Sequence, residues 1–294
     1  MDRKAVARET MRIMENGYYE IGKSNIQIKN QQERSVQDSF LLTPAQGEAL
    51  LEKYPEISNM EHPNRPVSHV VHVWNCSTVD AIIKLFNENT HDIAGLAPDE
   101  ATLKNTKIAV LNFASAKNPG GGFLNGAMAQ EESLAASSCL YQTLTAHEAY
   151  YQNNRACKSM MYTNHAIFSP EVVFFRNGKF NLLEKPVTAS VLTLPAVNMG
   201  QVRLKGEDVS LAEQTMRTRM KLALAIFAQQ GCRYLVLGAY GCGVFRNDPI
   251  KVASWWKELL DTCFPQYFES IVFAVLDRSA NLSCIQPFLD IFEC

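Results

Sequence analysis

The chain has 294 residues, of which 47% are apolar, which is enough for one large α/β domain with an extension or for two small domains. Its formal net charge of -2 argues against a strongly cationic body that grips nucleic acid through its overall field, so a polyanionic ligand would have to be held locally. The eight cysteines form no CxxC pair and no regular framework, which favours reduced thiols over disulfides or a zinc site.

The sequence carries no sign of secretion or membrane insertion. The first residues contain no apolar signal core, and no apolar run reaches the ~18 residues of a membrane span. We therefore expect a soluble, intracellular protein located in the cytoplasm. We find no internal repeat and no low-complexity tract.

The N-terminal part is expected to be a helical extension. Asp2 can cap a first helix that ends near Gly17. Thr43 followed by Pro44 is a suitable N-cap and first residue for a later helix. Between these helices, short strand-like pieces lead into the polar run KNQQERSVQD (residues 29–38), which we expect to be exposed.

Prolines at positions 55, 63 and 66 then break the chain and make the best internal boundary. We predict an N-terminal extension over residues 1–66 and a catalytic domain over residues 67–294. The extension is expected to pack on this domain, so that both form one structural unit.

Beyond this boundary, strands and helices alternate. Strands are predicted at VSHVVHVW (67–74), KIAVLNF (107–113), TASVLTLPAVN (188–198), RYLVLG (233–238) and IVFAVLD (271–277). Helices are predicted at 77–86, from 131, at 211–230, from 249 to 260 and at 288–292. Residues 162–178 indicate short strands with a turn at Ser169 and Pro170. This alternation predicts an α/β fold with a mixed, largely parallel sheet between helical layers.

The strand over residues 107–113 leads into the most informative stretch, NFASAKNPGGGFLNGAMAQEESLAASS, which begins at Asn112. Its three consecutive glycines remove every Cβ where the backbone must pass close to something. After seven more residues come Gln130, Glu131 and Glu132, at the expected start of a helix, where adjacent side chains diverge by ~100°. The two glutamates cannot face each other like the carboxylates of an ordinary glycosidase, so we expect one to accept hydrogen bonds from hydroxyls and the other to donate a proton.

Two considerations weigh against this functional interpretation of the glutamates. Acidic residues are common in the first turn of a helix, where they are usually only solvated. A helix N-terminus also stabilises the charged carboxylate and so disfavours a general acid. The position after three glycines and a buried strand favours function, and a bound diphosphate with exclusion of water would raise the pKa again.

A second glycine-rich loop, Gly238 to Phe245, follows the strand over residues 233–238. Its alternate glycines allow successive backbone N–H groups to turn inward, an arrangement that suits a diphosphate. The loop lacks the Lys and Ser/Thr of a P-loop, so ATP hydrolysis is not expected. In an open α/β sheet both loops lie at the same rim, where such folds bind ligands.

At these residues the sequence resembles the microbial-type poly(ADP-ribose) glycohydrolases, a branch of the macrodomain superfamily. The signature of that family is GGG, six to eight residues and QEE, and this chain has seven residues between its glycines and Gln130. The resemblance extends over most of the chain, through ARETMRIMENGYY (7–19), YTNHAIFSPEVVFFR (162–176), PAVN (195–198) and LGAYGCGVFRNDP (237–249). It implies a macrodomain-like three-layer α/β/α fold.

The resemblance implies roles for the residues of the first loop. Glu132 would be the catalytic acid, protonating the 2'-oxygen that leaves from the ribose–ribose bond and then activating water. Glu131 and Asn118 would hold the hydroxyls of the ribose that is cleaved, and Gln130 would support the loop. The substrate would also contact Gly120, Gly121 and Gly122.

In the second loop, the resemblance implies that backbone N–H groups of Gly241, Cys242, Gly243 and Val244 cradle the diphosphate. Phe245 would pack against the ribose and diphosphate. No metal and no cofactor is required in this scheme.

Two further groups of side chains are more typical of packing than of ligand binding. His69 and His72 point to opposite faces of their expected strand, so with His62 they do not predict a metal site. No motif identifies the adenine contact, and the aromatic candidates fit core positions better: Tyr18, Tyr19, Tyr162 and Phe168.

The leading hypothesis is a glycosidase that releases ADP-ribose from poly(ADP-ribose), mainly from chain ends. Its partners would be poly(ADP-ribose) or ADP-ribose and ADP-ribosylated proteins as substrates, without sequence-specific nucleic-acid binding or membrane contact. One alternative is a hydrolase of mono-ADP-ribosylated protein, nucleic acid or small conjugates. The other is a non-catalytic macrodomain that binds ADP-ribose, which the presence of both Glu131 and Glu132 disfavours.

Overall fold

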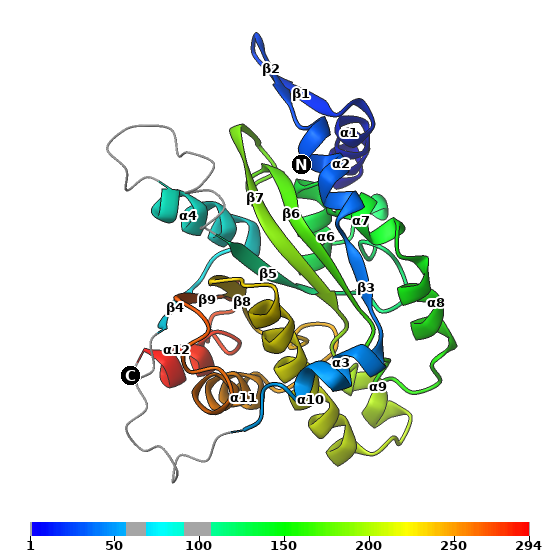
Figure 1. The fold of residues 1–294 in the computed structure, drawn as a ribbon, viewed down its shortest axis with the longest axis vertical. Helices are drawn as coiled ribbons and strands as arrows, with labels where there is room; N and C mark the ends of the chain where they lie inside the picture. The colour runs from blue at the N-terminus through cyan, green and yellow to red at the C-terminus, as the bar shows by residue number, and fades with distance from the viewer. Residues whose placement is uncertain (1, 57–68, 91–106, 294) are drawn as a thin grey trace.

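The computed structural model describes residues 2–56, 69–90 and 107–293. Within them, the centre of the fold is a seven-stranded sheet in the order β3–β6–β7–β5–β8–β9–β4 (Figure 1). Its strands are β3 (Phe40–Leu42), β4 (Val70–Trp74), β5 (Ile108–Phe113), β6 (Ala166–Arg176), β7 (Leu182–Leu194), β8 (Tyr234–Leu237) and β9 (Ser270–Ala274). From β7 to β4 all neighbours pair in parallel, whereas β6 is antiparallel to β7 and β3 to β6. The prediction of a mixed, largely parallel sheet is therefore confirmed.

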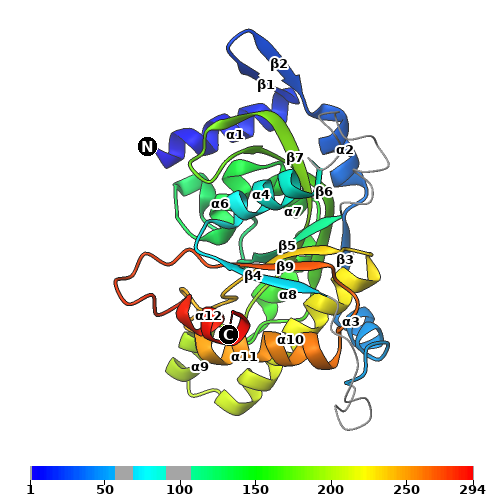
Figure 2. The same cartoon turned by 90° about the vertical axis from the view of Figure 1, so that its left-hand side faces the viewer.

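Helices cover both faces of this sheet (Figure 2). One face packs against α3 (Pro44–Leu51), α9 (Met199–Leu204), α10 (Val209–Gln229), α11 (Pro249–Thr262) and α12 (Gln286–Phe292). The other packs against α4 (Thr78–Thr90), α6 (Gln130–Ser137), α7 (Leu140–Thr145) and α8 (Glu148–Ala156). Strand β5 is apolar on both faces, as a strand between two helical layers must be. Ala109 and Leu111 are buried against the first set of helices, and Ile108 and Val110 are buried against the second. The fold is the expected three-layer α/β/α architecture.

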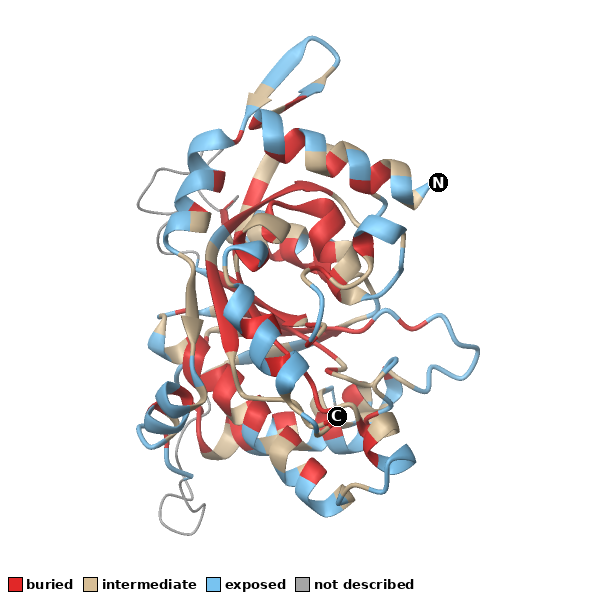
Figure 3. Ribbon diagram, turned by 90° about the vertical axis from the view of Figure 1, so that its right-hand side faces the viewer, coloured by how far each residue is buried: buried red, intermediate tan, exposed pale blue. Residues whose placement is uncertain are grey.

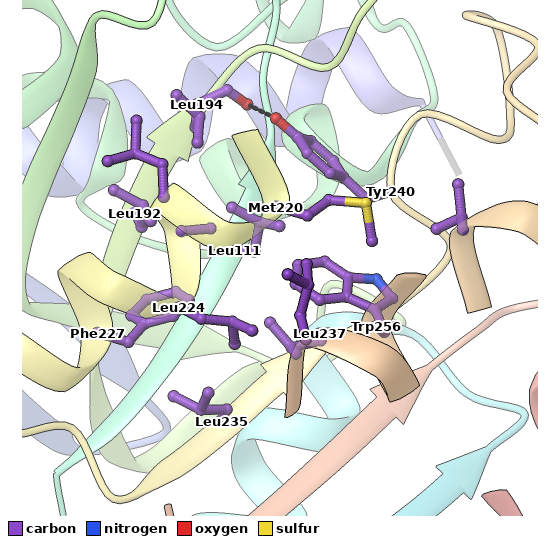
Figure 4. Packing of buried hydrophobic residues seen from close by; sticks show 14 of the residues in the cluster. Leu111, Leu192, Leu194, Met220, Leu224, Phe227, Leu235, Leu237, Tyr240 and Trp256 are labelled. Atoms are coloured by element: carbon purple, nitrogen blue, oxygen red, sulfur yellow. Dashed lines mark hydrogen bonds between the residues drawn. The ribbon is translucent and has the colours of Figure 1, made fainter. Parts of the chain in front are cut away.

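The larger core lies between the sheet and α10 and α11 (Figure 4). Leu224 and Phe227 of α10 and Trp256 of α11 pack there against leucines of β5, β7 and β8. Two of its aromatic residues also make hydrogen bonds. Trp256 Nε1 donates to Gly238 O at 3.2 Å, and Tyr240 Oη donates to Leu194 O at 2.9 Å. Both bonds tie the loop after β8 to its neighbours.

The N-terminal segment packs on the α6 side of the molecule. It consists of α1 (Arg3–Asn16), the hairpin β1 (Tyr18–Ile21) and β2 (Ser24–Gln27), and α2 (Lys29–Gln37). Helix α1 is amphipathic, and its buried stripe faces the body of the protein (Figure 3). Thr10 Oγ1 donates to Ala136 O at 2.7 Å, and Glu9 pairs with Arg176 at 2.7 Å. Asp2 and Thr43 cap their helices as predicted.

The polar run at residues 29–38 is mostly exposed, as predicted, and is largely the helix α2, which buries only Gln32 and Ser35. Gln32 Nε2 donates to Met14 O at 2.8 Å, and Ser35 Oγ donates to Pro170 O at 2.6 Å. One local prediction is wrong. Ser169 and Pro170 form no turn, because β6 continues through them as one strand with a bulge before Val172. The expected boundary at prolines 63 and 66, and His62, lie outside the described residues.

In the part of the chain that the structure describes, no helix is long and apolar enough to cross a membrane.

We predict that Leu224→Ala lowers the free energy of unfolding by about 2–5 kcal/mol, because Leu224 is fully buried and its loss leaves a cavity in the core. Urea unfolding measures this loss as a lower midpoint at an unchanged m-value. Leu211→Ala on the same helix is the control, since that side chain is 50% exposed and its loss should cost less than about 0.5 kcal/mol. Equal losses in the two variants would contradict this placement of the core.

Candidate active site

Three segments meet at the carboxyl ends of the parallel strands. They follow β5, β7 and β8, and they enclose a pocket of about 450 Å³. The pocket is lined by Phe113, Ala114, Ser115, Met128, Ala129, Gln130, Glu131, Glu132, Ala196, Ala239, Gly241, Gly243, Val244 and Phe245. The two glycine-rich loops, more than a hundred residues apart in sequence, therefore share one cavity.

The three glycines do not line this cavity, and they allow the chain to pass close to the glutamates. Gly120 and Gly121 have φ angles of 64° and 60°. A Cβ at Gly121 would lie 2.4 Å from Glu132 Oε1 and 3.1 Å from Glu131 Oε2. Position 121 therefore requires glycine for its backbone conformation and for the space that the carboxyls occupy.

Glu132 lies at the edge of the pocket, half-buried, in the first turn of α6. Its Oε1 accepts a hydrogen bond from Gly122 N at 2.9 Å, and its Oε2 accepts one from Ala129 N at 3.0 Å. The second bond closes the N-terminus of the helix, and the first joins the helix to the glycine loop.

Glu131 has a different environment, since its side chain is 2% exposed. Its Oε2 accepts from Ser115 N at 2.6 Å, and its Oε1 accepts from Asn112 Nδ2 at 3.3 Å. Burial raises the pKa of Glu131 to about 8, although these hydrogen bonds lower it, and the nearby Glu132 carboxyl adds to the rise. Burial thus favours the protonated form of Glu131, whereas the resemblance assigns the proton donor to Glu132.

Gln130 joins the start of α6 to the end of β5. Its Nε2 donates to Leu111 O at 2.8 Å, and its Oε1 accepts from Phe113 N at 2.9 Å. These two backbone groups lie on the same edge of the strand, because residues two apart share a direction. The side-chain amide extends the hydrogen-bond ladder of β5 and sets the position of the glutamates that follow.

The second loop turns at Gly241, whose φ is 72°. A Cβ there would lie 2.6 Å from Asn247 Nδ2 and 2.7 Å from Ala196 Cβ. Within the described residues, the backbone N–H groups of Gly243, Val244 and Phe245 donate to no protein group. These donors stand beside a cavity that they line, which is the arrangement expected of an anion site.

Not every expected site residue reaches the cavity. The N–H group of Cys242 donates to Ala239 O at 3.1 Å, inside a turn, so it is not free for a ligand. The exposed Asn118 organises the loop through its backbone, with its N–H on Ser115 Oγ (3.1 Å) and its carbonyl accepting from Gly121 N (3.0 Å). Cys242, Asn118, Gly120, Gly121 and Gly122 are absent from the pocket lining.

The sequence analysis missed polar residues that shape the site. Asn112 supports Glu131 and also donates to Thr193 Oγ1 at 3.1 Å. Asn247 Nδ2 donates to Val197 O at 2.8 Å and to Gly241 O at 3.1 Å, which fixes the second loop. Asn112 interrupts an apolar strand and could have been noticed for that reason. Asn247 carries no comparable signal.

The aromatic candidates divide into core and site. Tyr19 is buried, with its hydroxyl on Leu183 O at 2.6 Å, and Phe168 is buried in the larger core. The ring of Tyr162 lies 6.1 Å from that of Phe245, centroid to centroid. Tyr162 is therefore the candidate that adjoins the pocket, from behind Phe245.

Residues 7–177 match the family model described as microbial-type PARG, catalytic domain. The chain belongs to this family of poly(ADP-ribose) glycohydrolases. It is therefore an enzyme of the glycosidase class, and the predicted family is confirmed. A comparison with curated proteins found no match.

Solved structures agree over nearly the whole chain. Poly(ADP-ribose) glycohydrolase from Thermomonospora curvata is 35% identical, with 99% of each chain covered and a TM-score of 0.86. The same enzyme bound to the inhibitor ADP-HPD gives 34% identity over 98% of each chain, with a TM-score of 0.84. The enzyme from Deinococcus radiodurans in complex with ADP-ribose gives 37% identity over 89% of this chain and 97% of that chain, with a TM-score of 0.76.

We predict that Glu131 makes stability depend on pH. In the unfolded chain the pKa of Glu131 should be about 4.3, the usual value for glutamate. In the folded protein burial raises this pKa to about 8. Across this window the folded state binds more protons, so the free energy of unfolding falls as pH rises. Glu131→Gln removes the titration, so its stability relative to the wild type should rise across the same window in urea unfolding.

The matched control is Glu132→Gln, which changes the adjacent carboxyl and leaves Glu131 buried. A stability difference between Glu131→Gln and wild type that stays constant between pH 5 and pH 8 would contradict the shift.

Proposed function

We propose that the chain hydrolyses the ribose–ribose O-glycosidic bonds of poly(ADP-ribose) and releases ADP-ribose, mainly from chain ends. The observation that carries this proposal is the single pocket that joins Glu131 and Glu132 to the unpaired N–H groups of the second loop. Carboxyls can transfer protons in glycoside hydrolysis, and unpaired backbone N–H groups can bind the oxygens of a diphosphate. The solved relatives in complex with ADP-ribose and with an inhibitor support ADP-ribose as the ligand of this pocket.

Glu132 is the general acid and base in this scheme. It protonates the leaving 2'-oxygen as the bond to the anomeric carbon breaks, and its carboxylate then takes a proton from the attacking water. Its Oε1 accepts a hydrogen bond from Gly122 N, and its Oε2 accepts one from Ala129 N. These two bonds also hold the carboxyl in one orientation, which suits proton transfer in both steps.

Glu131 and Asn118 position the ribose in the same scheme. With a pKa raised to about 8, Glu131 carries a proton at neutral pH and can both donate and accept a hydrogen bond, as a hydroxyl partner requires. Gly241, Gly243 and Val244 supply N–H groups to the diphosphate, and Phe245 adds its own N–H group. Cys242 contributes through the turn that its own N–H group closes.

Two other functions would use the same pocket. A hydrolase of mono-ADP-ribosylated substrates would require the same acid and differ only in the leaving group. A non-catalytic ADP-ribose-binding domain would not need a carboxyl held at the pocket edge, as Glu132 is. We further propose that residues 1–66 and 67–294 act as one structural unit, and a cytoplasmic location stays a prediction from the sequence.

We predict that Glu132→Gln lowers the rate of ADP-ribose release from poly(ADP-ribose) at least ~10²-fold, because the general acid is lost. The variant should fold and bind ADP-ribose, since its amide oxygen can still accept from Gly122 N. Incubation of both proteins with the polymer and with a mono-ADP-ribosylated protein measures the effect. Release from the polymer by the wild type alone supports the proposal, and tight ADP-ribose binding without turnover by either protein overturns it.

We also predict that Gly121→Ala lowers this rate by at least about tenfold. The new Cβ would displace the Glu132 carboxyl, and alanine at a φ of 60° is strained. Gly22→Ala is the control, because Gly22 also has a φ of 60° but its Cβ would meet no atom within 4 Å. Equal activity of the two variants would show that the close approach at Gly121 is unimportant.

A further inference from the structure

Arg219 of α10 is a buried cation without a carboxylate partner in the described part of the chain. Its residue exposure is 1%, and no acidic side chain lies within ion-pair distance of it there. Two residues earlier on the same helix, Arg217 pairs with Glu56 at 3.0 Å and Glu258 at 2.8 Å. A charge removed from water and left without an opposite charge is costly, so Arg219 calls for a specific explanation.

The guanidinium group of Arg219 binds neutral oxygens that surround one residue. Its Nη1 donates to Met161 O at 2.8 Å, and its Nη2 donates to Tyr162 O at 3.4 Å. These carbonyls belong to the two peptide groups on either side of the Tyr162 Cα. Its Nε donates to Asn164 Oδ1 at 3.0 Å, which fixes the same segment further along.

Tyr162 needs this support, because its φ of 59° lies in the left-handed region that residues other than glycine rarely adopt. The conformation directs its ring toward Phe245, at a centroid distance of 6.1 Å. Phe245 lines the pocket. Arg219 therefore acts on the pocket wall through Tyr162, without reaching the cavity itself.

The same guanidinium group also holds the segment after β7. Its Nη1 donates to Pro195 O at 2.9 Å, and the next residue, Ala196, lines the pocket and packs under Gly241. The described residues that line the pocket include two glutamates and no lysine or arginine. Through its bond to Pro195 O, Arg219 places a full positive charge behind this part of the wall, and arginine keeps that charge when buried.

We infer that Arg219 is a positioning residue for hydrolysis: it holds Tyr162 behind Phe245 and sets an uncompensated positive charge behind the diphosphate wall. The inference rests on the proposed function, since it takes the ligand of the pocket to be the ADP-ribose unit. Geometry and charge can be separated by substitution. Lysine keeps the charge but cannot chelate both carbonyls of Tyr162, and methionine fills similar space without either property.

The experiment compares Arg219→Lys, Arg219→Met and Arg217→Met in the full chain, below the unfolding temperature of each. Calorimetry gives the Kd for ADP-ribose, and polymer hydrolysis gives kcat. We expect Arg219→Lys to lower kcat about tenfold with less than about a threefold change in Kd, and Arg219→Met to lower kcat and also raise Kd about tenfold. Arg217→Met removes a charge from the same helix and should change stability alone.

A purely structural role would not couple Arg219 to Phe245. In a Phe245→Ala background, we expect Arg219→Lys to lower kcat less than about twofold, because the ring through which it acts is gone. Additive losses overturn the inference, as does wild-type kcat and Kd in both Arg219 variants. If the wild type binds ADP-ribose without hydrolysing polymer, the proposed function fails, and the Kd of Arg219→Met against Arg217→Met still decides the role of Arg219.

Discussion

The site depends on one constraint: the first turn of α6 is bonded to the end of β5 and to the loop between them. Gln130 extends the ladder of β5, Glu131 accepts from Ser115 N, and Glu132 accepts from Gly122 N. Three consecutive side chains thus fix the path of the glycine loop, and that path has room for the carboxyls only because position 121 has no Cβ. The helix, the strand and the loop form one rigid unit, which keeps the reacting carboxyl at the rim of the sheet.

A second constraint is electrostatic, because a pocket with two carboxyls must accept a diphosphate. Positive charge near the pocket comes from the partial charges of backbone N–H groups and from a guanidinium group outside the pocket lining. The residues Gly243 to Phe245 line the cavity with unpaired backbone N–H groups, and the guanidinium group of Arg219 bonds the segment that follows β7. Burial also keeps Glu131 protonated at neutral pH, which removes one of the two negative charges. Each of these features lowers the repulsion between a diphosphate and the carboxyls, and none of them places a cation in the pocket lining beside Glu132.

Sequence reasoning predicted the elements whose signal is local. The buried strands β5, β7 and β8 appear as apolar runs, and the glycine loops follow them directly. Helix α2 was missed because its apolar content is low and distant backbone carbonyls satisfy Gln32 and Ser35. Arg219 is hidden for a similar reason, since a cation in an amphipathic helix usually faces water and only the fold brings Tyr162 to it. Contacts made across the chain leave no pattern in a single sequence.

The adjacent glutamates show why spacing predicts a division of roles better than it predicts which role falls to each. Neighbouring positions on α6 point one carboxyl under the loop and the other to the pocket edge, so their environments must differ. Burial raises the pKa of Glu131, and its oxygens already accept from Ser115 N and Asn112 Nδ2. This carboxyl is therefore fixed in place and suits a hydrogen bond to a ribose hydroxyl better than proton transfer. Glu132 is held only by backbone donors and remains half-exposed, so a leaving oxygen can approach it. Access therefore favours Glu132 as the group that transfers the proton.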